Sequence, residues 1–559
     1  MSGRRTRRKP IVTSPQNRDR SVVFSLAFLL AVGAFFLSSI PYYYAIAKAP
    51  EGTRFIGQLV HADDINSYYS FIRQAASGHI VFRNAMTHIP HAPAFVNLEF
   101  LLAGWGMALF NCSTQALYEG WRVLAAFSAL LGFGMLALVA LRTQRERIIA
   151  LFMFAFGGGF GWFAYLLQRA GILSAHTDVE LHNPAMDLTV AFHPFGQMVI
   201  NPHFALPHGL FLLFVASYIM AEKSGKRSWY CIAALVALIQ ALFRPYDLIS
   251  LFGILPLFVV VETVFARKVD WRRSIDRLIP LFVTGPLLLY YVWIFSFHPI
   301  FKYWASQGVQ PPVPFLLHYL AFGFAGVLFL WRVLNYRRYP LETSPDRLLA
   351  VWVIAVLALF HGNRVFSFLP YTPQLGIPLA SPMILLGVAV FRRSQEDAPA
   401  RLRPAFVIAA AIFLIVNALS SPLFVARACQ LAANNNENYI SNSDEQAVEW
   451  LKSQVKETDV VLTDYPTGTT LSQLVTARVV LGHWALTPHL DSLAKEVDRF
   501  LRGELNQPEA ESFLQRLGVN YVFVTARRDH KGPSYFQALP GLREVFKNDT
   551  VAIFARSAS

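Results

Sequence analysis

The chain has 559 residues, of which 54% are hydrophobic, 14% aromatic and only 15% charged. A soluble protein of this length cannot bury so large an apolar share, so the composition excludes a wholly water-soluble chain. The formal net charge of +14 does not indicate a nucleic-acid partner, because the Lys and Arg residues cluster beside apolar runs.

Apolar segments long enough to cross a bilayer recur from Ser21 to about Val425. A transmembrane helix needs roughly 20 mostly apolar residues, and about eleven stretches meet that requirement. They are residues 22–46, 121–141, 148–168, 203–221, 229–247, 249–265, 276–297, 313–332, 347–361, 371–391 and 404–426. The sequence therefore predicts a polytopic α-helical membrane domain over residues 22–426, after a basic cytoplasmic N-terminus of residues 1–21.

The positive charges between these segments predict their orientation, because Lys and Arg prefer cytoplasmic loops. They gather in residues 4–20, 142–147, 223–227, 267–273, 332–338 and 392–403. The apolar stretch from Pro93 to Phe110 is predicted to be an interfacial helix, since counting it as a span would put Arg142, Arg145 and Arg147 outside. This choice places the N-terminus inside, and the first outer loop (residues 47–120) and the C-terminus outside.

The apolar runs stop after Ala426. A linker is predicted at residues 427–442, and residues 443–559 alternate helical and strand patterns, which predicts a small extracytoplasmic α/β domain. Its expected helices lie near Asp444–Lys456, Leu490–Leu501 and Pro508–Leu517, and its expected strands at Val460–Thr463, Val479–Gly482, Tyr521–Thr525 and Val551–Ala555.

Two adjacent carboxylates, Asp63 and Asp64, follow the first span in the first outer loop. An ionised carboxylate can accept the proton of an attacking hydroxyl group, or it can hold a divalent cation. The alternative is that the pair only caps a helix beginning near Asn66. The local sequence leaves both interpretations open.

Two arginines stand at the predicted outer ends of spans. Arg244 precedes Pro245, which can break the helix and turn the guanidinium into a cavity, and Arg364 is the only basic residue of its loop. Both are candidates to bind a phosphate group, and contact with lipid headgroups is the alternative for Arg364.

The same predicted side carries other polar residues, which are expected to form a substrate pocket: Tyr68, His88, His91, Asp187, Asn201, His203, Tyr246, Asp247 and His361. Ionisable groups near the bilayer cost roughly 2.5–3.5 kcal/mol each unless they line a wet cavity or meet partners. Their clustering therefore predicts a functional site. The histidines have no metal-ligand spacing, so no metal ligand is assigned.

Two further segments have competing interpretations. Gly157, Gly158, Gly159 and Gly161 look like a phosphate loop, but they lie inside an apolar span, where small residues favour close helix packing. In the tail, the segment Gly482–Pro488 follows a strand, a usual place for loop function. It is expected to contact an acceptor or to dock the domain on the membrane face.

The order of Asp63 and Asp64 after the first span, the segment His88–Pro93 and the following apolar helix resembles the GT-C superfamily of membrane glycosyltransferases, such as protein O-mannosyltransferases and the lipid A aminoarabinose transferase. The resemblance is specific only in residues 1–140. It implies a GT-C-like fold, a sugar donor carried on a polyprenyl phosphate, and a role for Asp63 or Asp64 as catalytic base or metal ligand. The resemblance does not fix a cofactor, but a divalent cation, Mg²⁺ or Mn²⁺, could neutralise the phosphate of the donor.

The resulting hypothesis is a bacterial multi-pass glycosyltransferase of the cytoplasmic membrane, which moves a sugar to a lipid, glycan or protein acceptor on the extracytoplasmic side. Its partners would be the lipid-linked donor, that acceptor and membrane lipids. The alternative is a transporter or flippase of a lipid-linked or anionic substrate, in which the same residues line a path. A third possibility is a membrane scaffold whose tail binds other proteins.

Overall fold

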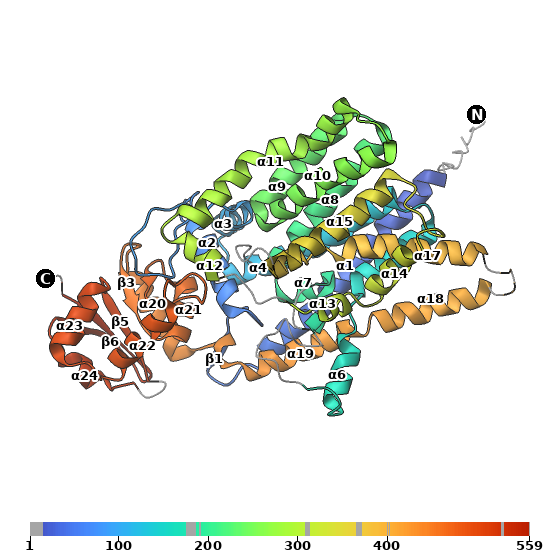
Figure 1. Cartoon of the computed structure of the whole chain (residues 1–559). Helices are drawn as coiled ribbons and strands as arrows, with labels where there is room; N and C mark the ends of the chain where they lie inside the picture. Colours follow the sequence, from blue (N-terminus) through green and yellow to red (C-terminus); the bar gives the residue numbers. More distant parts are fainter. Residues whose placement is uncertain are drawn as a thin grey trace, which may run out of the picture.

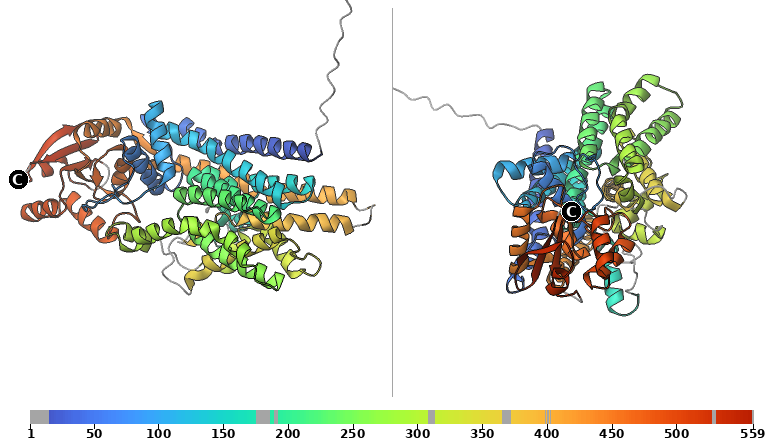
Figure 2. Two further views of the ribbon diagram at one scale, coloured as in Figure 1. Left: turned by 90° about the horizontal axis from the view of Figure 1, so that it is seen from above. Right: turned by 90° about the vertical axis from the view of Figure 1, so that its left-hand side faces the viewer.

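The computed structural model describes residues 15–174, 186–188, 192–307, 313–364, 372–397, 399, 401, 403–526 and 530–557. A bundle of long helices carries a small α/β domain at one end (Figure 1). Seen from above, the long helices run side by side, and the α/β domain extends the bundle along its long axis (Figure 2).

The bundle contains helices of very different length. They are α1 (Pro15–Ala47), α4 (Thr114–Ala140), α5 (Gln144–Phe156), α6 (Gly161–Arg169), α8 (Pro202–Ser224), α9 (Arg227–Phe243), α10 (Tyr246–Ala266), α11 (Trp271–Phe297), α14 (Gly323–Leu334), α15 (Ser344–Phe360), α17 (Ala380–Asp397), α18 (Arg403–Asn417) and α19 (Ser420–Asn434). Shorter elements join them: η2 (Met186–Leu188), α7 (Pro194–Ile200), α12 (Phe301–Gln307), α13 (Phe315–Leu320), η3 (His361–Arg364) and α16 (Thr372–Leu375).

Six segments of the described chain are long and apolar enough to cross a membrane, and the bent pair α5–α6 would make a seventh. The six are α1 from Asp19, α4, α8, α10, α11 and the stretch Val407–Asn434 across α18 and α19. The other predicted spans, residues 229–247, 313–332, 347–361 and 371–391, overlap α9, α14, α15 and α17, the second and the fourth only over their later halves, and these helices do not meet both criteria. The predicted number of spans, about eleven, is thus larger than the six or seven segments of the described chain that qualify on length and hydropathy.

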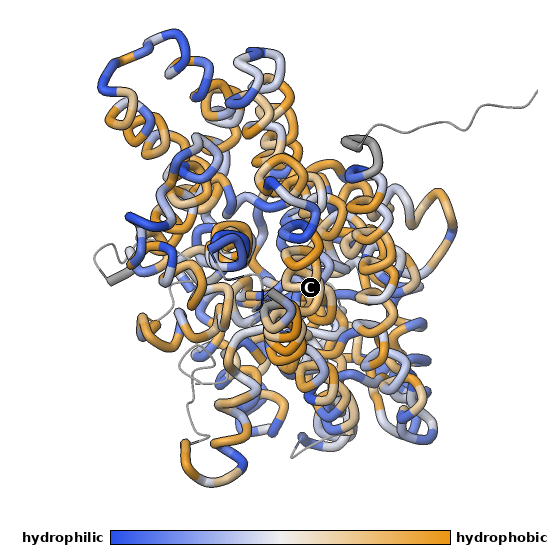
Figure 3. The backbone as a smooth tube through the Cα atoms, turned by 90° about the vertical axis from the view of Figure 1, so that its right-hand side faces the viewer, coloured by the Kyte–Doolittle hydropathy of each residue, from blue (hydrophilic) through white to orange (hydrophobic). Residues whose placement is uncertain are grey.

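Large apolar side chains remain exposed along these helices. Leu29, Phe36, Leu289 and Phe297 keep between 63% and 72% of their surface exposed. Soluble proteins rarely expose contiguous apolar surface on this scale. Viewed from the end opposite the α/β domain, the helices are largely hydrophobic and the hydrophilic residues concentrate in turns (Figure 3). The bundle is therefore the membrane part of a multi-pass protein.

The first loop contains three elements, β1 (Thr53–Phe55), α2 (Ala62–Ala76) and α3 (Leu98–Phe110). Helix α3 occupies the stretch predicted to be interfacial. Asn97 caps its start, since its side chain accepts the N–H of Phe100. Strand β1 pairs antiparallel with β2 (Tyr439–Ser441), which lies nearly 400 residues later in the chain. This pairing joins the first loop to the start of the tail.

The tail folds as a sheet between two helical layers. After η5 (Asn436–Asn438) and β2 come α20 (Asn442–Gln454), β3 (Val460–Leu462), α21 (Tyr465–Leu474), β4 (Arg478–Val479), α22 (Leu490–Leu501), α23 (Gln507–Arg516), β5 (Tyr521–Thr525), α24 (Pro533–Gln537), β6 (Leu542–Lys547) and β7 (Val551–Arg556). The strand order is β4-β3-β5-β7-β6, in which β4, β3 and β5 are parallel.

Alternate side chains of these strands build two hydrophobic cores. Val460 and Val522 pack with α22 and α23 on one face, whereas Val461 and Phe523 pack with α20 and α21 on the other. The predicted α/β class is confirmed.

The two ends of the bundle are chemically different. Helix α1 has 33 residues and so spans roughly 50 Å. Near its start Asp19 pairs with Arg147 at 3.2 Å, and beyond its other end lies β1. The described parts of the basic segments predicted to share one side of the membrane gather at the Asp19 end, which we call the distal end. The first loop and the α/β domain meet at the opposite end.

Candidate active site

Helix α2 presents both aspartates in its first turn. It begins at Ala62, and its cap residue is His61, which has a left-handed backbone (φ 52°) and makes no side-chain capping bond. The proposed cap for a helix beginning near Asn66 is therefore wrong: the helix starts earlier, and neither aspartate is its cap residue. Carboxylates are favoured in a first turn by the helix dipole, which leaves their side chains available for other partners.

Asp64 is hydrogen-bonded to His483 of the α/β domain. His483 Nε2 lies 3.1 Å from Asp64 Oδ1, and the histidine is almost fully buried. Its Nδ1 accepts the backbone N–H groups of Ala485 and Leu486 at 2.9 and 3.2 Å. A ring nitrogen that accepts carries no proton, so in the neutral ring the proton is on Nε2 and is donated to Asp64.

The environment keeps Asp64 ionised. Burial disfavours the charged carboxylate, but the hydrogen bond that His483 donates, with electrostatic contributions from the neighbouring histidines, outweighs it and lowers the pKa of Asp64 below its ordinary value. At neutral pH this site therefore holds a carboxylate that can accept a proton.

Asp63 also meets the α/β domain. Its carboxylate accepts a hydrogen bond from the hydroxyl group of Tyr465, at the start of α21. Burial of Tyr465, together with that bond and the charge of Asp63, raises the phenol pKa above its usual value. The phenol therefore stays protonated and remains the donor.

The loop that carries His483 is fastened to the first loop. The Asn84 side chain donates to the carbonyl group of Leu486 at 2.6 Å, and the Thr487 hydroxyl donates to the carbonyl group of Met86 at 2.7 Å. These contacts are buried, so they fix where His483 stands relative to α2. The segment Gly482–Pro488 thus attaches the α/β domain to the first loop. It also supplies His483, the hydrogen-bond partner of Asp64.

Aromatic and acidic groups surround the aspartates on the bundle side. The ring of Tyr68 lies 5.0 Å from that of His203, whose Nδ1 is 2.6 Å from Glu99 Oε2. The Glu99 carboxylate also accepts the indole N–H of Trp121 at 2.9 Å. Burial and the nearby charge of Asp64 raise the pKa of Tyr68, so this phenol is neutral and can donate a hydrogen bond. Tyr246 also lies within electrostatic reach of Asp64.

Arg244 and Asp247 form a buried pair at the break between α9 and α10. Arg244 Nη1 lies 3.2 Å from Asp247 Oδ1, and Nη2 donates to the Gln374 backbone and side chain at 2.6 and 2.9 Å. The break occurs at Pro245, as predicted. Arg244 Nε has no hydrogen-bond partner among the described residues. Only this N–H group is free for a ligand in the arrangement seen, whereas the side chain of Arg364 lies outside the described residues.

Other predicted pocket residues have partners elsewhere. His91 donates from Nδ1 to the carbonyl group of Ile89 and accepts the N–H of Asn84 at Nε2, so it shapes the first loop. The His88 backbone carbonyl accepts a bond from Arg478 at 2.7 Å. Burial and nearby arginines lower the pKa of His88 to about 4. Neither histidine has a direct contact with Asp63 or Asp64 within the described chain.

Asn201, Asp187 and His361 hold helices in place. Asn201 caps α8 and accepts the hydroxyl of Tyr118 at 2.5 Å. Asp187 accepts the Ser420 hydroxyl at 2.9 Å and the N–H of Gly159 at 2.7 Å.

The glycines at this turn allow a close approach, because a Cβ on Gly161 would lie 2.0 Å from Asp187 Oδ1. This observation favours the packing interpretation. His361 Nε2 lies 3.1 Å from His318 Nδ1, on the α13 side.

Metal binding does not fit the residues as placed. No group of three or more His, Cys, Asp or Glu side chains in the described parts of the chain could hold a metal ion. His483 accepts two backbone N–H groups at Nδ1 and directs the proton on Nε2 at Asp64. Neither ring nitrogen therefore has a lone pair free to bind a metal ion.

Sequence reasoning did not assign Glu99, Tyr465 or a direct role for His483. Glu99 had a usable signal, since it is the only acid in the otherwise apolar α3. Tyr465 gave none, and His483 stood out only as part of the segment Gly482–Pro488, because their pairing with the aspartates depends on the docking of two segments about 400 residues apart in the chain.

Comparison with known proteins gives the fold a context. The apo oligosaccharyltransferase of Archaeoglobus fulgidus has 12% identity over 89% of this chain and 69% of its own, with a TM-score of 0.57. The same enzyme, AglB, in complex with an inhibitory peptide and a dolichol-phosphate gives a TM-score of 0.51, at 12% identity and the same coverage. The arabinofuranosyltransferase AftD from Mycobacteria has 15% identity over 95% of this chain but only 40% of its own, with a TM-score of 0.57.

Sequence comparison is less informative. Residues 371–556 match a family of unknown function, DUF6541. A search of the curated proteins returns no match. At these identities the likeness to the solved structures establishes the fold alone. Together with the apolar helices and the C-terminal sheet, it gives this chain the architecture of the GT-C membrane glycosyltransferases, as the first-loop motif predicted.

Proposed function

We propose that this chain is a membrane glycosyltransferase, which moves a sugar from a polyprenyl-phosphate donor to the hydroxyl group of an acceptor. The observation that carries the proposal is the Asp64–His483 pair, in which a histidine donates its Nε2 proton to a carboxylate that stays ionised. The fold supports it, since AglB and AftD are enzymes of this class and one AglB structure is a complex with a dolichol-phosphate.

In this mechanism Asp64 is the catalytic base. The acceptor oxygen attacks the anomeric carbon, the bond from that carbon to the phosphate oxygen breaks, and the polyprenyl phosphate leaves with the electron pair. The acceptor proton passes to the Asp64 carboxylate. Its negative charge also stabilises the positive charge that develops on the sugar ring. His483 is a positioning residue, because it holds the carboxylate and acts through it.

The remaining predicted residues have supporting roles. Tyr68, His203 and Tyr246 are proposed to contact sugar hydroxyls, since phenol and imidazole groups can donate and accept hydrogen bonds. Arg244 and Arg364 are proposed to bind the donor phosphate, in the case of Arg244 through the N–H group that has no partner in the described chain.

The proposed setting is a bacterial cytoplasmic membrane with the N-terminus inside. The basic distal end would then face the cytoplasm, in agreement with the positive-inside rule, and the site and the α/β domain would face outward. The acceptor would be a lipid, a glycan or a protein that reaches the outer face.

The test is transfer of radiolabelled sugar by the purified protein in liposomes, from a panel of polyprenyl-phosphate sugars. Asp64→Asn is expected to lower kcat about 10²–10⁴-fold, while the variant still folds with a modestly lower melting temperature. Asp63→Asn is the matched control and should retain most activity, because an amide oxygen can still accept the Tyr465 hydroxyl. Full transfer by Asp64→Asn would contradict the assignment. Label that crosses the bilayer without transfer would instead identify a transporter.

A further inference from the structure

A second site candidate lies at the distal end of the bundle, far from the aspartates. A cavity of about 370 Å³ opens where α4 ends and α5 begins, and it is also lined by side chains of α8, α14, α15 and α17. Its volume falls within the range of roughly 300–1,000 Å³ that is usual for small-ligand sites. The proposed transfer reaction does not use it.

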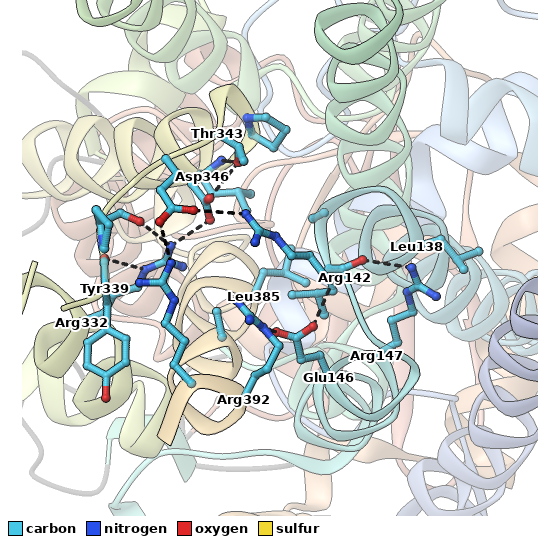
Figure 4. Close-up of a pocket in the computed structure, with 18 of the residues that line it drawn as sticks. Leu138, Arg142, Glu146, Arg147, Arg332, Tyr339, Thr343, Asp346, Leu385 and Arg392 are labelled. Carbon is cyan, nitrogen blue, oxygen red and sulfur yellow. Dashed lines mark hydrogen bonds and ion pairs between the residues drawn. The ribbon is translucent and has the colours of Figure 1, made fainter. Parts of the chain in front are cut away.

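The lining of this cavity is strongly basic. Six cationic side chains face three carboxylates; the cations are Arg142, Arg147, Lys223, Arg332, Arg392 and Arg393, and the acids are Glu146, Glu342 and Asp346. Each acid already has an arginine partner: Asp346 pairs with Arg332 at 2.9 Å, Glu342 with Arg393 at 2.8 Å and Glu146 with Arg392 at 3.0 Å. Figure 4 shows Asp346 beside Arg332 and Glu146 beside Arg392 in the lining of the cavity.

Positive charge therefore remains without an acidic partner inside the cavity. Asp19 and Glu396 reach Arg147 and Arg392 from outside, but both are about half exposed and so are solvated. The Lys223 ammonium group donates to the backbone carbonyl of Val139, and it lies close enough to Arg142 and Arg147 for their charges to repel one another. Bringing an anion into this space would relieve that repulsion.

The position of the cavity along the membrane-spanning helices indicates the source of such an anion. The apolar helices α4 and α8 end beside it, at Ala140 and Ser224, so it lies where the hydrocarbon region stops. Trp331 and Tyr336, at the end of α14, are 53% and 62% exposed. Exposed Trp and Tyr side chains prefer the level of the lipid headgroups.

We propose that this distal cavity binds the phosphodiester group of an anionic phospholipid headgroup. Basic pockets between transmembrane helices are known to take such groups. Arg142, Lys223 and Arg393 would contact the phosphate, because Lys223 has no carboxylate partner in the described chain and the other two share one exposed carboxylate, Glu342. The bound lipid would join α4, α8 and α17 at this end.

The test uses the full-length protein in a neutral detergent and native mass spectrometry. Phosphatidylglycerol, phosphatidylcholine and inorganic phosphate are titrated separately. We expect bound phosphatidylglycerol and a higher melting temperature with that lipid, and neither with phosphatidylcholine. Equal binding of the two lipids would overturn the proposal. Inorganic phosphate that displaces phosphatidylglycerol at equal concentration would show that the site takes a free anion, and it would overturn the lipid assignment.

A double variant locates the site. Lys223→Gln with Arg393→Gln removes two cationic groups of the cavity and should weaken phosphatidylglycerol binding about tenfold or more. Arg145→Gln, an exposed arginine of α5 outside the cavity lining, is the matched control and should bind as the parent does. Parent-like binding by the double variant would overturn the proposal. If that variant does not fold, Lys223→Gln alone makes the same comparison.

Discussion

The two ends of the helical bundle use charged residues in opposite ways. At the distal end, Glu222 is fully buried and is bound by Arg277 at 2.8 Å and by Arg273 at 3.0 Å. At the other end, Asp63 and Asp64 are bound by a phenol and an imidazole that come from a separate domain. Arginine keeps its charge at any accessible pH, whereas histidine does not. The distal contacts are therefore suited to hold helices permanently, and the contacts of the aspartates to respond to a ligand or a proton.

The largest effect on stability is expected at Glu222. Glu222→Gln removes one of the two carboxylate partners of Arg277 and leaves it with Glu262 at 2.8 Å, and disrupting a buried charge network in this way costs up to about 3–5 kcal/mol. The measurement is the melting temperature in detergent, which should fall sharply. Glu342→Gln is the control, since its carboxyl group is 47% exposed and pairs with arginines near the surface. It should change stability by less than about 1 kcal/mol.

A pair of substitutions at His483 separates its two hydrogen-bonding roles. His483→Asn keeps an acceptor near Nδ1 but loses the donor to Asp64, whereas His483→Gln keeps a donor near Nε2 and loses the acceptor. In the Asn variant the burial of Asp64 is opposed only by the weaker effects of His61 and His203, so its pKa rises and the acid limb of the activity profile moves to higher pH. The Gln variant should lower the melting temperature with little movement of that limb.

The same lowered pKa predicts a pH-dependent stability. Because the pKa of Asp64 is lower in the folded protein, its contribution is present above the unfolded value of about 4 and is lost as the pH falls through the folded value. The gap in melting temperature between the parent and His483→Asn should therefore be full at pH 7 and should shrink below about pH 4. A gap that is constant with pH would show that the charge of Asp64 does not depend on His483.

A smaller effect is expected for the second aspartate. Tyr465→Phe removes one hydrogen bond to a partly buried carboxylate and keeps the ring, so it should cost about 1–2 kcal/mol. A double-mutant cycle with Asp63→Ala, which removes the acceptor, measures whether the cost belongs to this contact. If the two effects simply add, the phenol does not stabilise the docking of the α/β domain through Asp63.

The smallest effect is expected at a surface pair across the same junction. Arg54 and Glu445 are 2.6 Å apart, but their side chains are 47% and 36% exposed. Arg54→Gln should change stability by less than about 0.5 kcal/mol. A larger loss would mean that charge pairs at the rim, and not the buried contacts of Asn84 and Thr487, hold the α/β domain in place.

Local patterns predicted much of the fold. The expected helix Leu490–Leu501 and strand Tyr521–Thr525 coincide with α22 and β5. Helix α21 was missed because Tyr465–Leu474 contains Gly468 and three threonines, which are poor helix formers. Its start is fixed by a capping bond from Asp464, and its position by packing against α2. Strand β6 was missed because its edge position leaves charged residues such as Arg543 and Lys547 exposed.

The candidate site was predictable only in part, for a physical reason. Asp63 and Asp64 stand out because two adjacent charges follow an apolar span, and Arg244 stands out because of Pro245. The partners of the aspartates come from docking geometry, which no local pattern encodes. His91, Asn201 and Asp187 were assigned to the pocket because they are polar and share the predicted side, yet their hydrogen bonds go to nearby backbone and helix ends.

The short β1–β2 pairing limits how the two parts of the protein can move apart. It ties the first loop to the beginning of the tail through the register of Thr53 with Ser441 and of Phe55 with Tyr439. The His483 loop makes the second attachment. A rotation about the β1–β2 pair would have to break the contacts of Asp64 with His483, of Asp63 with Tyr465 and of Arg83 with Glu457. The α/β domain is thus joined to the bundle both by this strand pair and by the contacts of the two α2 carboxylates.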